Sequence, residues 1–331
     1  MNKVLVTGAS GHLGFHIVSE LVKRGYKVRA SLRDLNNTRK TNKLKELGVE
    51  IVYADLLDRA SLVQALLGCD GLFQVAAGFK ILTKDMMKDV WRPAMEGTEN
   101  ALRAAHEAGI KKVIYTSSVA AVGMSGDGVA KDEQAWNDQA QEFYAHSKNE
   151  AEKLAWKLSR ELSLNLIAVL PGTIIGPGFS EYTPSTYFFQ KIAHNKLPML
   201  PELSFSYVDV RDVAAAHVEA YEQPSASGRY IVTRETLPAS KVYTIAHAAF
   251  ERIKVPARHI PKFMLPLLPF MDWLENRITG SMRTLTRGVV REYMSGKQQL
   301  FDTAKAKREL AWAPRPIEDS IRDTLHWIYE H

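Results

Sequence analysis

The amino-acid sequence predicts an α/β protein whose core is a doubly wound parallel sheet. Short, uncharged runs rich in Val, Ile and Leu recur between residues 4 and 233, and such runs are typical of strands buried on both faces. Segments with apolar residues at helical spacing alternate with these runs, as they do where helices connect parallel strands. The chain has 331 residues, enough for one full domain of this kind and a smaller second one.

The chain opens on a strand, a glycine turn and a helix. Residues 4–6 are the strand, glycines follow at intervals of three, and apolar residues at helical spacing continue to Val22. Small residues let a pyrophosphate approach the backbone, and the amides and dipole at the start of the helix attract its charge. This context predicts a dinucleotide-binding Rossmann fold. The expected contacts in the turn are Gly8, Ser10, Gly11, His12, Leu13 and Gly14.

The end of the second strand, residues 27–32, indicates which dinucleotide is bound. In NAD-binding sheets an acidic residue ends this strand and holds the ribose hydroxyls. Here that position falls at Leu32, and the guanidinium of Arg33, which follows, suits a 2′-phosphate. Arg39 and Lys40 on the same loop would add further positive charge. We therefore expect NADP(H), with NAD(H) possible if a shift of one residue makes Asp34 the ribose ligand; the alternative for Arg33 is a solvated loop charge.

The third strand, residues 49–54, leads into Asp55 and Leu56. We expect Asp55 to contact the adenine edge of the cofactor and Leu56 to pack against it. Asp55 has an alternative role as the N-cap of a helix over residues 59–67.

The fourth strand, residues 71–77, ends in two small residues, Ala76 and Ala77. Small side chains at the carboxyl edge of a sheet leave room for a cofactor. Both alanines are therefore expected to contact it.

A Tyr-x-x-x-Lys pattern places a phenol and an ammonium on one face of a helix. It occurs as Tyr144/Lys148, Tyr187/Lys191 and Tyr293/Lys297. Gly296 interrupts the helix of the third pair, and the second pair follows the sixth strand, where the chain leaves the nucleotide domain. Only the first pair follows a strand that ends in serines and opens a helix at the carboxyl edge of the sheet. We expect this pair to be catalytic; the alternative is a surface tyrosine and a solvated lysine.

These residues suit the reduction of a carbonyl group, which gains a hydride at carbon and a proton at oxygen. A phenol has an unperturbed pKa near 10. The ammonium of Lys148 and the positive ring of an oxidised nicotinamide favour phenolate, so we expect a lowered pKa for Tyr144 and exchange of its proton near neutral pH. Ser118 would hydrogen-bond the substrate oxygen, with Ser117 as the rival for that role.

Seven stretches in this order resemble the extended short-chain dehydrogenase/reductase family, in its dihydroflavonol reductase and cinnamoyl-CoA reductase branch of the NAD-dependent epimerase/dehydratase superfamily. The stretches are Gly8/Gly11/Gly14, residues 33–34, 117–118, 144–148, 170–177, 207–214 and 301–310. The resemblance covers the whole chain and implies an NADPH-dependent reductase of a ketone or aldehyde. It implies that Tyr144 is the proton donor, that Lys148 also holds the nicotinamide ribose, and that Ser118 is the catalytic serine.

The same resemblance implies that Pro171 and Thr173 lie against the nicotinamide. Nucleotide-sugar epimerases usually carry Arg and Asn in this stretch, whereas residues 170–174 are Leu-Pro-Gly-Thr-Ile, which favours a less polar carbonyl substrate. A nucleotide-sugar or 3-beta-hydroxysteroid-type epimerase/dehydrogenase is the second reading. A non-catalytic NADP-binding redox sensor is the third, although such relatives usually lack the tyrosine–lysine pair.

The expected domains are an NAD(P)-binding Rossmann domain, residues 1–175 and 206–235, and a substrate-binding domain, residues 176–205 and 236–331. The proline-rich apolar residues 259–274 line either a pocket or an interface. We expect a monomer or homodimer.

Composition limits the cellular setting and the partners. The single cysteine, Cys69, excludes an intramolecular disulfide and fits a reducing compartment, so a cytoplasmic protein without signal peptide or membrane span is expected. The net charge of +6 is spread along the chain, which suits small anionic ligands better than nucleic acid. No His or carboxylate spacing predicts a metal site.

Overall fold

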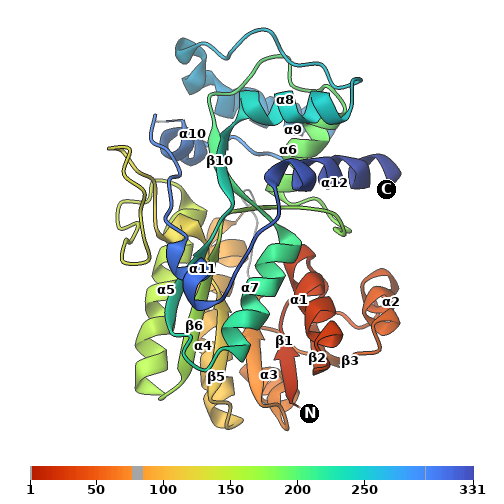
Figure 1. The fold of residues 1–331 in the computed structure, drawn as a ribbon, viewed down its shortest axis with the longest axis vertical. Coiled ribbons are helices and arrows are strands. Elements are labelled where there is room, and N and C mark those ends of the chain that lie inside the picture. Colours follow the sequence, from red (N-terminus) through yellow and green to blue (C-terminus); the bar gives the residue numbers. More distant parts are fainter. Residues whose placement is uncertain (1, 77–84, 295) are drawn as a thin grey trace.

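The computed structural model describes residues 2–76, 85–294 and 296–331 and has a seven-stranded parallel sheet at its centre (Figure 1). The strand order is β3-β2-β1-β4-β5-β6-β9, and the order reverses between β1 and β4. The predicted fold class is therefore confirmed. The strands are β1 (Lys3–Val6), β2 (Lys27–Leu32), β3 (Glu50–Tyr53), β4 (Gly71–Gln74), β5 (Lys112–Thr116), β6 (Asn165–Pro171) and β9 (Gly228–Val232).

Helices cover both faces of this sheet, and each face has its own apolar core. Val6, Ile17 and Val213 belong to the core under α1 and α7, while Leu72, Leu102 and Leu158 belong to the core on the opposite face. The strand order reverses between β1 and β4, which leaves a crevice outside the carboxyl ends of these strands. Ligands bind in this crevice in open α/β sheets. The covering helices are α1 (His12–Lys23) and α7 (Val210–Glu222) on one face, and α3 (Arg59–Leu66), α4 (Arg92–Glu107) and α5 (Phe143–Glu161) on the other.

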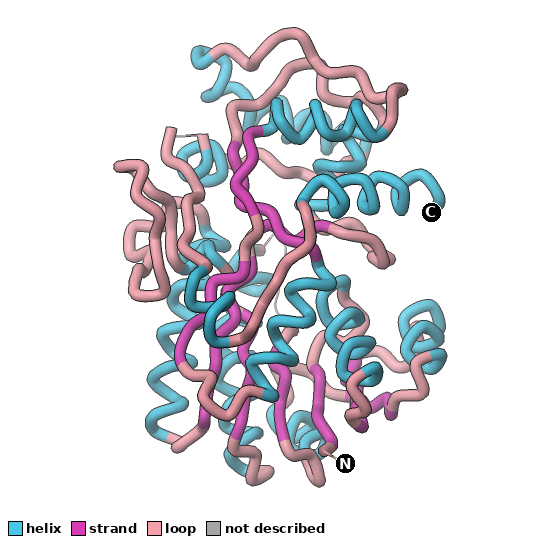
Figure 2. The backbone as a smooth tube through the Cα atoms, viewed as in Figure 1, coloured by secondary structure: helices cyan, strands magenta, loops and turns pink. Residues whose placement is uncertain are grey.

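A second lobe stands on the carboxyl edge of the sheet (Figures 1 and 2). It contains the three-stranded sheet β10-β8-β7 and a third apolar core that includes Phe189, Tyr243 and Ile321. Its strands are β7 (Thr173–Ile175), β8 (Ser204–Asp209) and β10 (Glu235–Pro238). Its helices are α6 (Pro184–Ala193), α8 (Ala239–Ala249), α9 (Leu268–Thr279), α10 (Arg287–Tyr293) and α12 (Ile317–Glu330). Two smaller helices lie elsewhere, α2 (Thr38–Glu46) and α11 (Ala304–Glu309).

The observed elements differ from the predicted ones mainly at their ends. β2 has its predicted bounds, whereas the expected third strand loses a residue at each end, and β8 begins before the expected domain boundary at residue 206. The division into two domains stays a prediction. The alternative role of Asp55 as helix N-cap is wrong: Asp58 caps α3 by accepting a hydrogen bond from the Ser61 amide, while Asp55 accepts one from the amide of Leu57.

No helix among the residues that the structure describes is both long and apolar enough to cross a membrane. Within the same residues, no group of three or more His, Cys, Asp or Glu side chains could hold a metal ion.

Candidate active site

One cavity of about 870 Å³ runs along the carboxyl edge of the central sheet and continues under the second lobe. With one exception, every residue predicted to contact the cofactor or to take part in catalysis lines it. These residues are Gly8, Ser10, Gly11, His12, Leu13, Gly14, Arg33, Lys40, Asp55, Leu56, Ala76, Ser118, Tyr144, Lys148, Pro171 and Thr173. The exception is Ala77, which lies outside the described residues.

The glycine turn forms a cradle that only glycines fit. Gly8 has φ +65°, and a Cβ on it would lie 2.9 Å from the Cα of Ala76. A Cβ on Gly14 would overlap the carbonyl oxygen of Gly8, so this glycine lets α1 pack closely on the turn. No side chain caps the N-terminus of α1 at Gly11, and its first turn has no acidic residue. The cradle therefore fits a pyrophosphate held by backbone amides.

Thr7 fixes this cradle to the neighbouring strand, a role that sequence reasoning missed. Its hydroxyl donates to the side chain of Gln74 at 2.9 Å and accepts from the amides of Val75 and Ala76 at 3.0 and 3.1 Å. Thr7 is fully buried, so these bonds join the ends of β1 and β4 at the reversal in strand order. The sequence does contain a signal for this role, because Thr7 is a polar residue between the apolar strand and Gly8.

Arg33, not Asp34, faces the cavity after β2. Arg33 lines it, whereas the Asp34 carboxylate accepts a hydrogen bond from the amide of Asn36 at 2.9 Å and is outside the lining. Lys40 also lines it and pairs at 2.9 Å with Glu181, another lining residue. Of the three predicted cations, Arg33 and Lys40 thus line the cavity, whereas Arg39 does not.

The position of Leu56 is set by α4. The side-chain Nδ2 of Asn100 donates to the Leu56 carbonyl at 2.9 Å, and a Cβ on Gly97 would lie 3.1 Å from the Leu56 side chain. Leu56 and the neighbouring Asp55 both line the cavity beside the cradle.

The N-terminus of α5 positions the tyrosine–lysine pair. Glu142 caps the helix by accepting from the amide of Ala145 at 2.8 Å, which places Tyr144 in the first turn and Lys148 one turn later. The Tyr144 hydroxyl is hydrogen-bonded to the side chain of Ser118. The Lys148 ammonium donates to the carbonyl of Thr116 at 3.0 Å. Three groups with the chemistry of a carbonyl reductase are thus brought to one wall of the cavity.

The two candidate serines have different surroundings. Ser117 is buried, and its hydroxyl donates to Glu152 at 2.6 Å. Ser118 accepts from the amide of Ala120 and reaches Tyr144. The geometry therefore favours Ser118 for the contact with a substrate oxygen.

The pKa of Tyr144 differs from the sequence-based expectation. Burial raises it above the ordinary value, and the hydrogen bond with Ser118 opposes this only in part. The expected lowering by Lys148 is not found, because desolvation dominates at the phenol and the ammonium is directed at the Thr116 carbonyl. Burial also lowers the pKa of Lys148 to about 8, opposed by the carboxylate of Glu152.

A buried ion pair supports this wall from behind. Arg229 of β9 donates to Glu152 of α5 at 2.7 Å, and its guanidinium lies 3.9 Å from the ring centroid of Trp136. Glu152 also accepts from Ser117 and from the indole of Trp156. Every carboxylate oxygen of Glu152 therefore has a partner, as a charge in an apolar core requires.

Residues of the second lobe that sequence reasoning did not predict form the opposite wall. Tyr187, Lys191 and Tyr293, from the two Tyr-x-x-x-Lys pairs that were not expected to be catalytic, belong to this wall. The ammonium of Lys191 forms an ion pair with Glu275 at 3.2 Å. Most of the others are apolar or aromatic. The wall includes Tyr182, Tyr187, Phe188, Lys191, Leu197, Met199, Leu203, Phe205, Ile260, Leu285, Val289 and Tyr293.

Two histidines of α1 tie the glycine turn to the loop that follows β7. His12 and His16 place Nε2 at 2.9 and 3.0 Å from the carbonyl oxygen of Pro177. Burial, with the neighbouring His16, lowers the pKa of His12 to about 4, so the ring is neutral at pH 7. His12 lines the cavity as predicted, and its side chain is also hydrogen-bonded to the Pro177 carbonyl.

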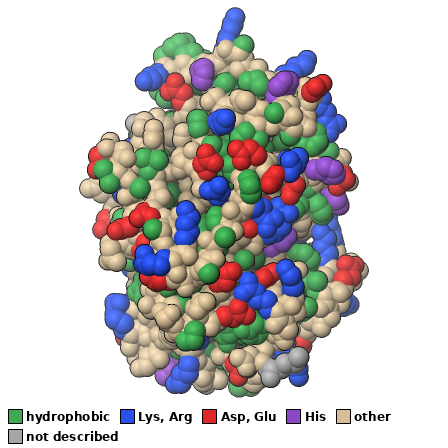
Figure 3. Space-filling view, viewed as in Figure 1, with side chains coloured by type: hydrophobic (Ala, Val, Ile, Leu, Met, Phe, Trp, Pro, Cys, Tyr) green, Lys and Arg blue, Asp and Glu red, His purple; other side chains and the backbone are tan. Residues whose placement is uncertain are grey.

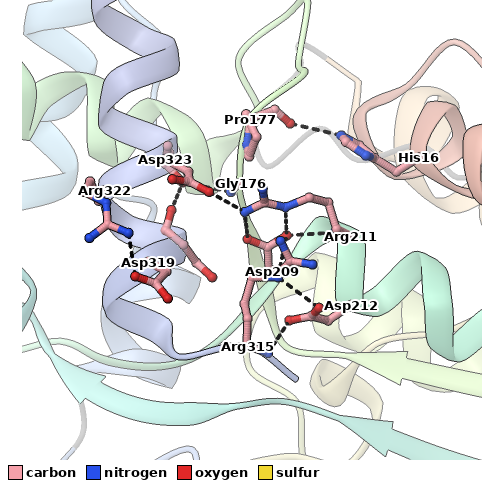
Figure 4. Close-up of polar contacts among 12 residues, drawn as sticks. His16, Gly176, Pro177, Asp209, Arg211, Asp212, Arg315, Asp319, Arg322 and Asp323 are labelled. Atoms are coloured by element: carbon pink, nitrogen blue, oxygen red, sulfur yellow. Dashed lines mark hydrogen bonds and ion pairs between the residues drawn. The ribbon is translucent and has the colours of Figure 1, made fainter. Parts of the chain in front are cut away.

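Ion pairs fix the end of β8 beside the same loop (Figure 4). Asp209 is buried and accepts from the guanidinium of Arg211 at 2.7 and 2.8 Å, and these bonds hold the pKa of Asp209 below its ordinary value although burial opposes them. Arg211 also reaches Asp323 of α12 at 2.7 Å, and Arg315 pairs with Asp212 at 3.0 Å. The network joins α7 and α12 to the second sheet and does not line the cavity.

Comparisons with known proteins agree with this geometry. The model of the NAD dependent epimerase/dehydratase family matches residues 4–255. Cinnamoyl-CoA reductase 1 of Arabidopsis thaliana is 32% identical over 92% of this chain and 89% of its own. The crystal structure of gox2253 is 34% identical with a TM-score of 0.85, over 100% of this chain and 99% of that chain.

A more distant structure shows the same fold. Yeast methylglyoxal/isovaleraldehyde reductase Gre2 complexed with NADPH is 23% identical with a TM-score of 0.78, over 99% and 98% of the two chains. Together these findings confirm the predicted resemblance to extended short-chain reductases and the prediction of an NAD(P)-dependent oxidoreductase.

Proposed function

The chain belongs to the NAD-dependent epimerase/dehydratase family, and we propose that it is an NADPH-dependent reductase that converts a ketone or aldehyde to an alcohol. The observation that carries the proposal is the set Ser118, Tyr144 and Lys148 on the wall of the same cavity as the glycine cradle. A dinucleotide with its pyrophosphate on the cradle can reach this set along the strand ends.

When bound, the nicotinamide supplies the hydride. Tyr144 donates its proton to the carbonyl oxygen as negative charge develops there, and its raised pKa keeps that proton on the phenol until the substrate arrives. The Ser118 hydroxyl donates a second hydrogen bond to the same oxygen. Lys148, oriented by its hydrogen bond to the Thr116 carbonyl, holds the ribose of the cofactor.

The preference for NADPH rests on Arg33 and Lys40. Both line the cavity, and Asp34, the candidate ribose ligand of an NAD enzyme, does not. A guanidinium and an ammonium at this place favour a 2′-phosphate over a free ribose hydroxyl.

The class of substrate follows from the opposite wall. Its aromatic and apolar side chains, and the uncharged Pro171 and Thr173, suit a carbonyl compound with an apolar body. The relative from Arabidopsis is named for reduction of cinnamoyl-CoA, which agrees with this class. A nucleotide-sugar or 3-beta-hydroxysteroid-type epimerase/dehydrogenase is the second candidate, because the family whose model matches residues 4–255 also includes epimerases. We also propose that the protein is cytoplasmic and is a monomer or a homodimer.

The decisive experiment follows NADPH oxidation with aromatic, aliphatic and 1,2-dicarbonyl compounds. With the best substrate, Tyr144→Phe should lower kcat by about 10³-fold, because the proton donor is lost. Tyr187→Phe, from a second Tyr-x-x-x-Lys pair on the same cavity, is the matched control and should change kcat less than tenfold. Equal losses in the two variants, or none, contradict the assignment. A non-catalytic sensor would oxidise no NADPH with any compound, and an epimerase would turn over without net oxidation.

Arg33→Ala tests the cofactor preference. We expect KM for NADPH to rise by about 10–100-fold while KM for NADH changes little, since one charge-assisted contact contributes about 1.5–3 kcal/mol. Arg39→Ala is the control, because Arg39 donates to the carbonyl of Ser180 and does not line the cavity. Equal effects on both cofactors would rule out the phosphate role of Arg33.

A further inference from the structure

The most unusual surface of the molecule is the outside of α9 and the short 3-10 helix before it, Lys262–Leu267. Of the fourteen large apolar side chains that are exposed among the described residues, eight lie between Val255 and Ile278. Phe263, Phe270 and Ile278 are 78%, 60% and 74% exposed. Single exposed apolar residues are ordinary, but such a concentration marks a contact surface.

The exposed residues share one side of α9. At 3.6 residues per turn, Phe270, Leu274 and Ile278 fall in a line, and Trp273 and Met271 flank it. We call these five side chains the outer face of α9. The opposite side of the helix carries the polar contacts with the protein, where buried Asp272 accepts from Arg283 at 3.1 Å and from the Thr284 amide at 2.9 Å. In a typical surface helix the apolar side faces the core, whereas in α9 the apolar side faces outward and the buried side carries the polar contacts.

Residues 255–278 carry three exposed cationic side chains and one exposed carboxylate, Glu275. Arg258, Lys262 and Arg277 are exposed, and Arg277 lies within the outer face itself. The two carboxylates of the segment are both paired, Asp272 with Arg283 and Glu275 with Lys191. Figure 3 shows hydrophobic and basic side chains at the end of the molecule where α8 and α9 lie, with some acidic side chains and histidines among them.

We propose that the outer face of α9 docks on a membrane surface that carries anionic lipids. Phe, Trp, Leu and Ile side chains would enter the headgroup region, while Arg258, Lys262 and Arg277 meet lipid phosphates and carboxylates. A second copy of the chain fits less well, because a two-fold interface centred here would bring the same three cations against themselves. Charge complementarity thus selects the lipid surface.

Docking there would bring the second-lobe wall of the cavity close to the membrane. Two residues that line the cavity, Lys191 and Thr284, are bonded to the inner side of α9 through Glu275 and Asp272. An apolar carbonyl compound that partitions into lipid would then lie next to the apolar wall. This consequence rests on the proposed function, whereas the docking itself is independent of turnover.

Sedimentation of the full-length protein with vesicles tests the docking. We expect binding to phosphatidylcholine vesicles that contain roughly one-third phosphatidylserine, weak binding to phosphatidylcholine alone, and loss of binding as salt is raised. The double variant Lys262→Gln/Arg277→Gln should weaken binding about 25-fold, at about fivefold for each cation. Phe270→Ser/Ile278→Ser should weaken it by more than about tenfold.

Matched controls are Lys157→Gln and Val129→Ser, which remove an exposed cation and an exposed apolar side chain elsewhere and should leave binding unchanged. Absence of binding by the wild type, or equal binding by all variants, overturns the proposal. So does a change from dimer to monomer in Phe270→Ser/Ile278→Ser, measured by light scattering without lipid, because a second copy would then cover the face. A failure of NADPH oxidation leaves the result of this experiment untouched.

Discussion

The two walls of the cavity are built in different ways. The wall at the sheet edge takes its residues from the ends of neighbouring strands, and the groups behind it are buried and fully bonded, as at Thr7 and at Glu152. The wall from the second lobe takes its residues from helices and loops far apart in the chain, and its main ion pair, Lys191–Glu275, has a half-exposed carboxylate.

The difference separates two tasks. A cofactor with fixed dimensions is held by strand register and backbone, which tolerate little change. A substrate is recognised by side chains on loosely coupled elements, which can change without disturbing the sheet. We therefore expect substitutions of similar type to have large effects on stability at the sheet wall and small ones at the lobe wall.

The largest difference in stability between variants of the two walls should come from their ion pairs, Glu152–Arg229 and Glu275–Lys191. Glu152→Ala leaves Arg229 buried without its charge partner, which costs about 3–5 kcal/mol in free energy of unfolding. Glu275→Ala leaves Lys191, whose side chain is only 10% exposed, without its carboxylate, but this ammonium lines the cavity, where water solvates it, so the expected cost is about 1–2 kcal/mol. Guanidinium unfolding curves of the two variants measure both values. Similar losses in the two variants would contradict the difference between the walls.

The glycines provide a second contrast. In Gly14→Ala the new methyl group meets the backbone oxygen of Gly8, which cannot move without opening the glycine turn, and we expect a loss of about 2–3 kcal/mol. In Gly288→Ala, within α10 of the second lobe, the nearest atom is the carbonyl oxygen of Gln141 at 3.1 Å. There the gain in helix propensity offsets a mild contact, so the net change should stay within about 1 kcal/mol. Thermal unfolding of the pair decides whether the sheet wall is the stiffer one.

The difference between the two walls also explains which site residues could be predicted from the sequence. The glycine cradle, Arg33 and Tyr144 were predicted because each depends on a strand, a turn and a helix that are contiguous in the chain, and β2 has its predicted bounds for the same reason. Their assigned roles stay predictions until they are measured.

The lobe wall was not predictable in this way. Tyr187 and Tyr293 were set aside because their local sequence gave no reason to bring them to the sheet edge, yet both line the cavity. Their position depends on the return of the chain through β8 and on packing between residues about a hundred positions apart. The effect of burial on the pKa of Tyr144 was missed for a related reason, because desolvation depends on how tightly tertiary neighbours close around the phenol.

The smallest predicted effect concerns pH and a histidine behind the sheet wall. His217 is fully buried; its Nδ1 donates to the carbonyl of Val213 at 2.8 Å, so Nε2 accepts from the hydroxyl of Thr116 at 2.9 Å. Burial lowers its pKa from 6.5 to about 4. Between these two values the unfolded chain binds a proton that the folded chain does not, so stability falls as the pH falls.

Between pH 7 and pH 5, His217 should therefore lower the free energy of unfolding by about 2 kcal/mol. His217→Gln removes this contribution, and its loss of stability over the same range should be smaller than that of the wild type by that amount. His326→Gln, on the exposed side of α12, is the control and should follow the wild type. Denaturant unfolding at the two pH values gives the comparison, and parallel losses in wild type and His217→Gln would mean that other groups set the acid sensitivity of the sheet wall.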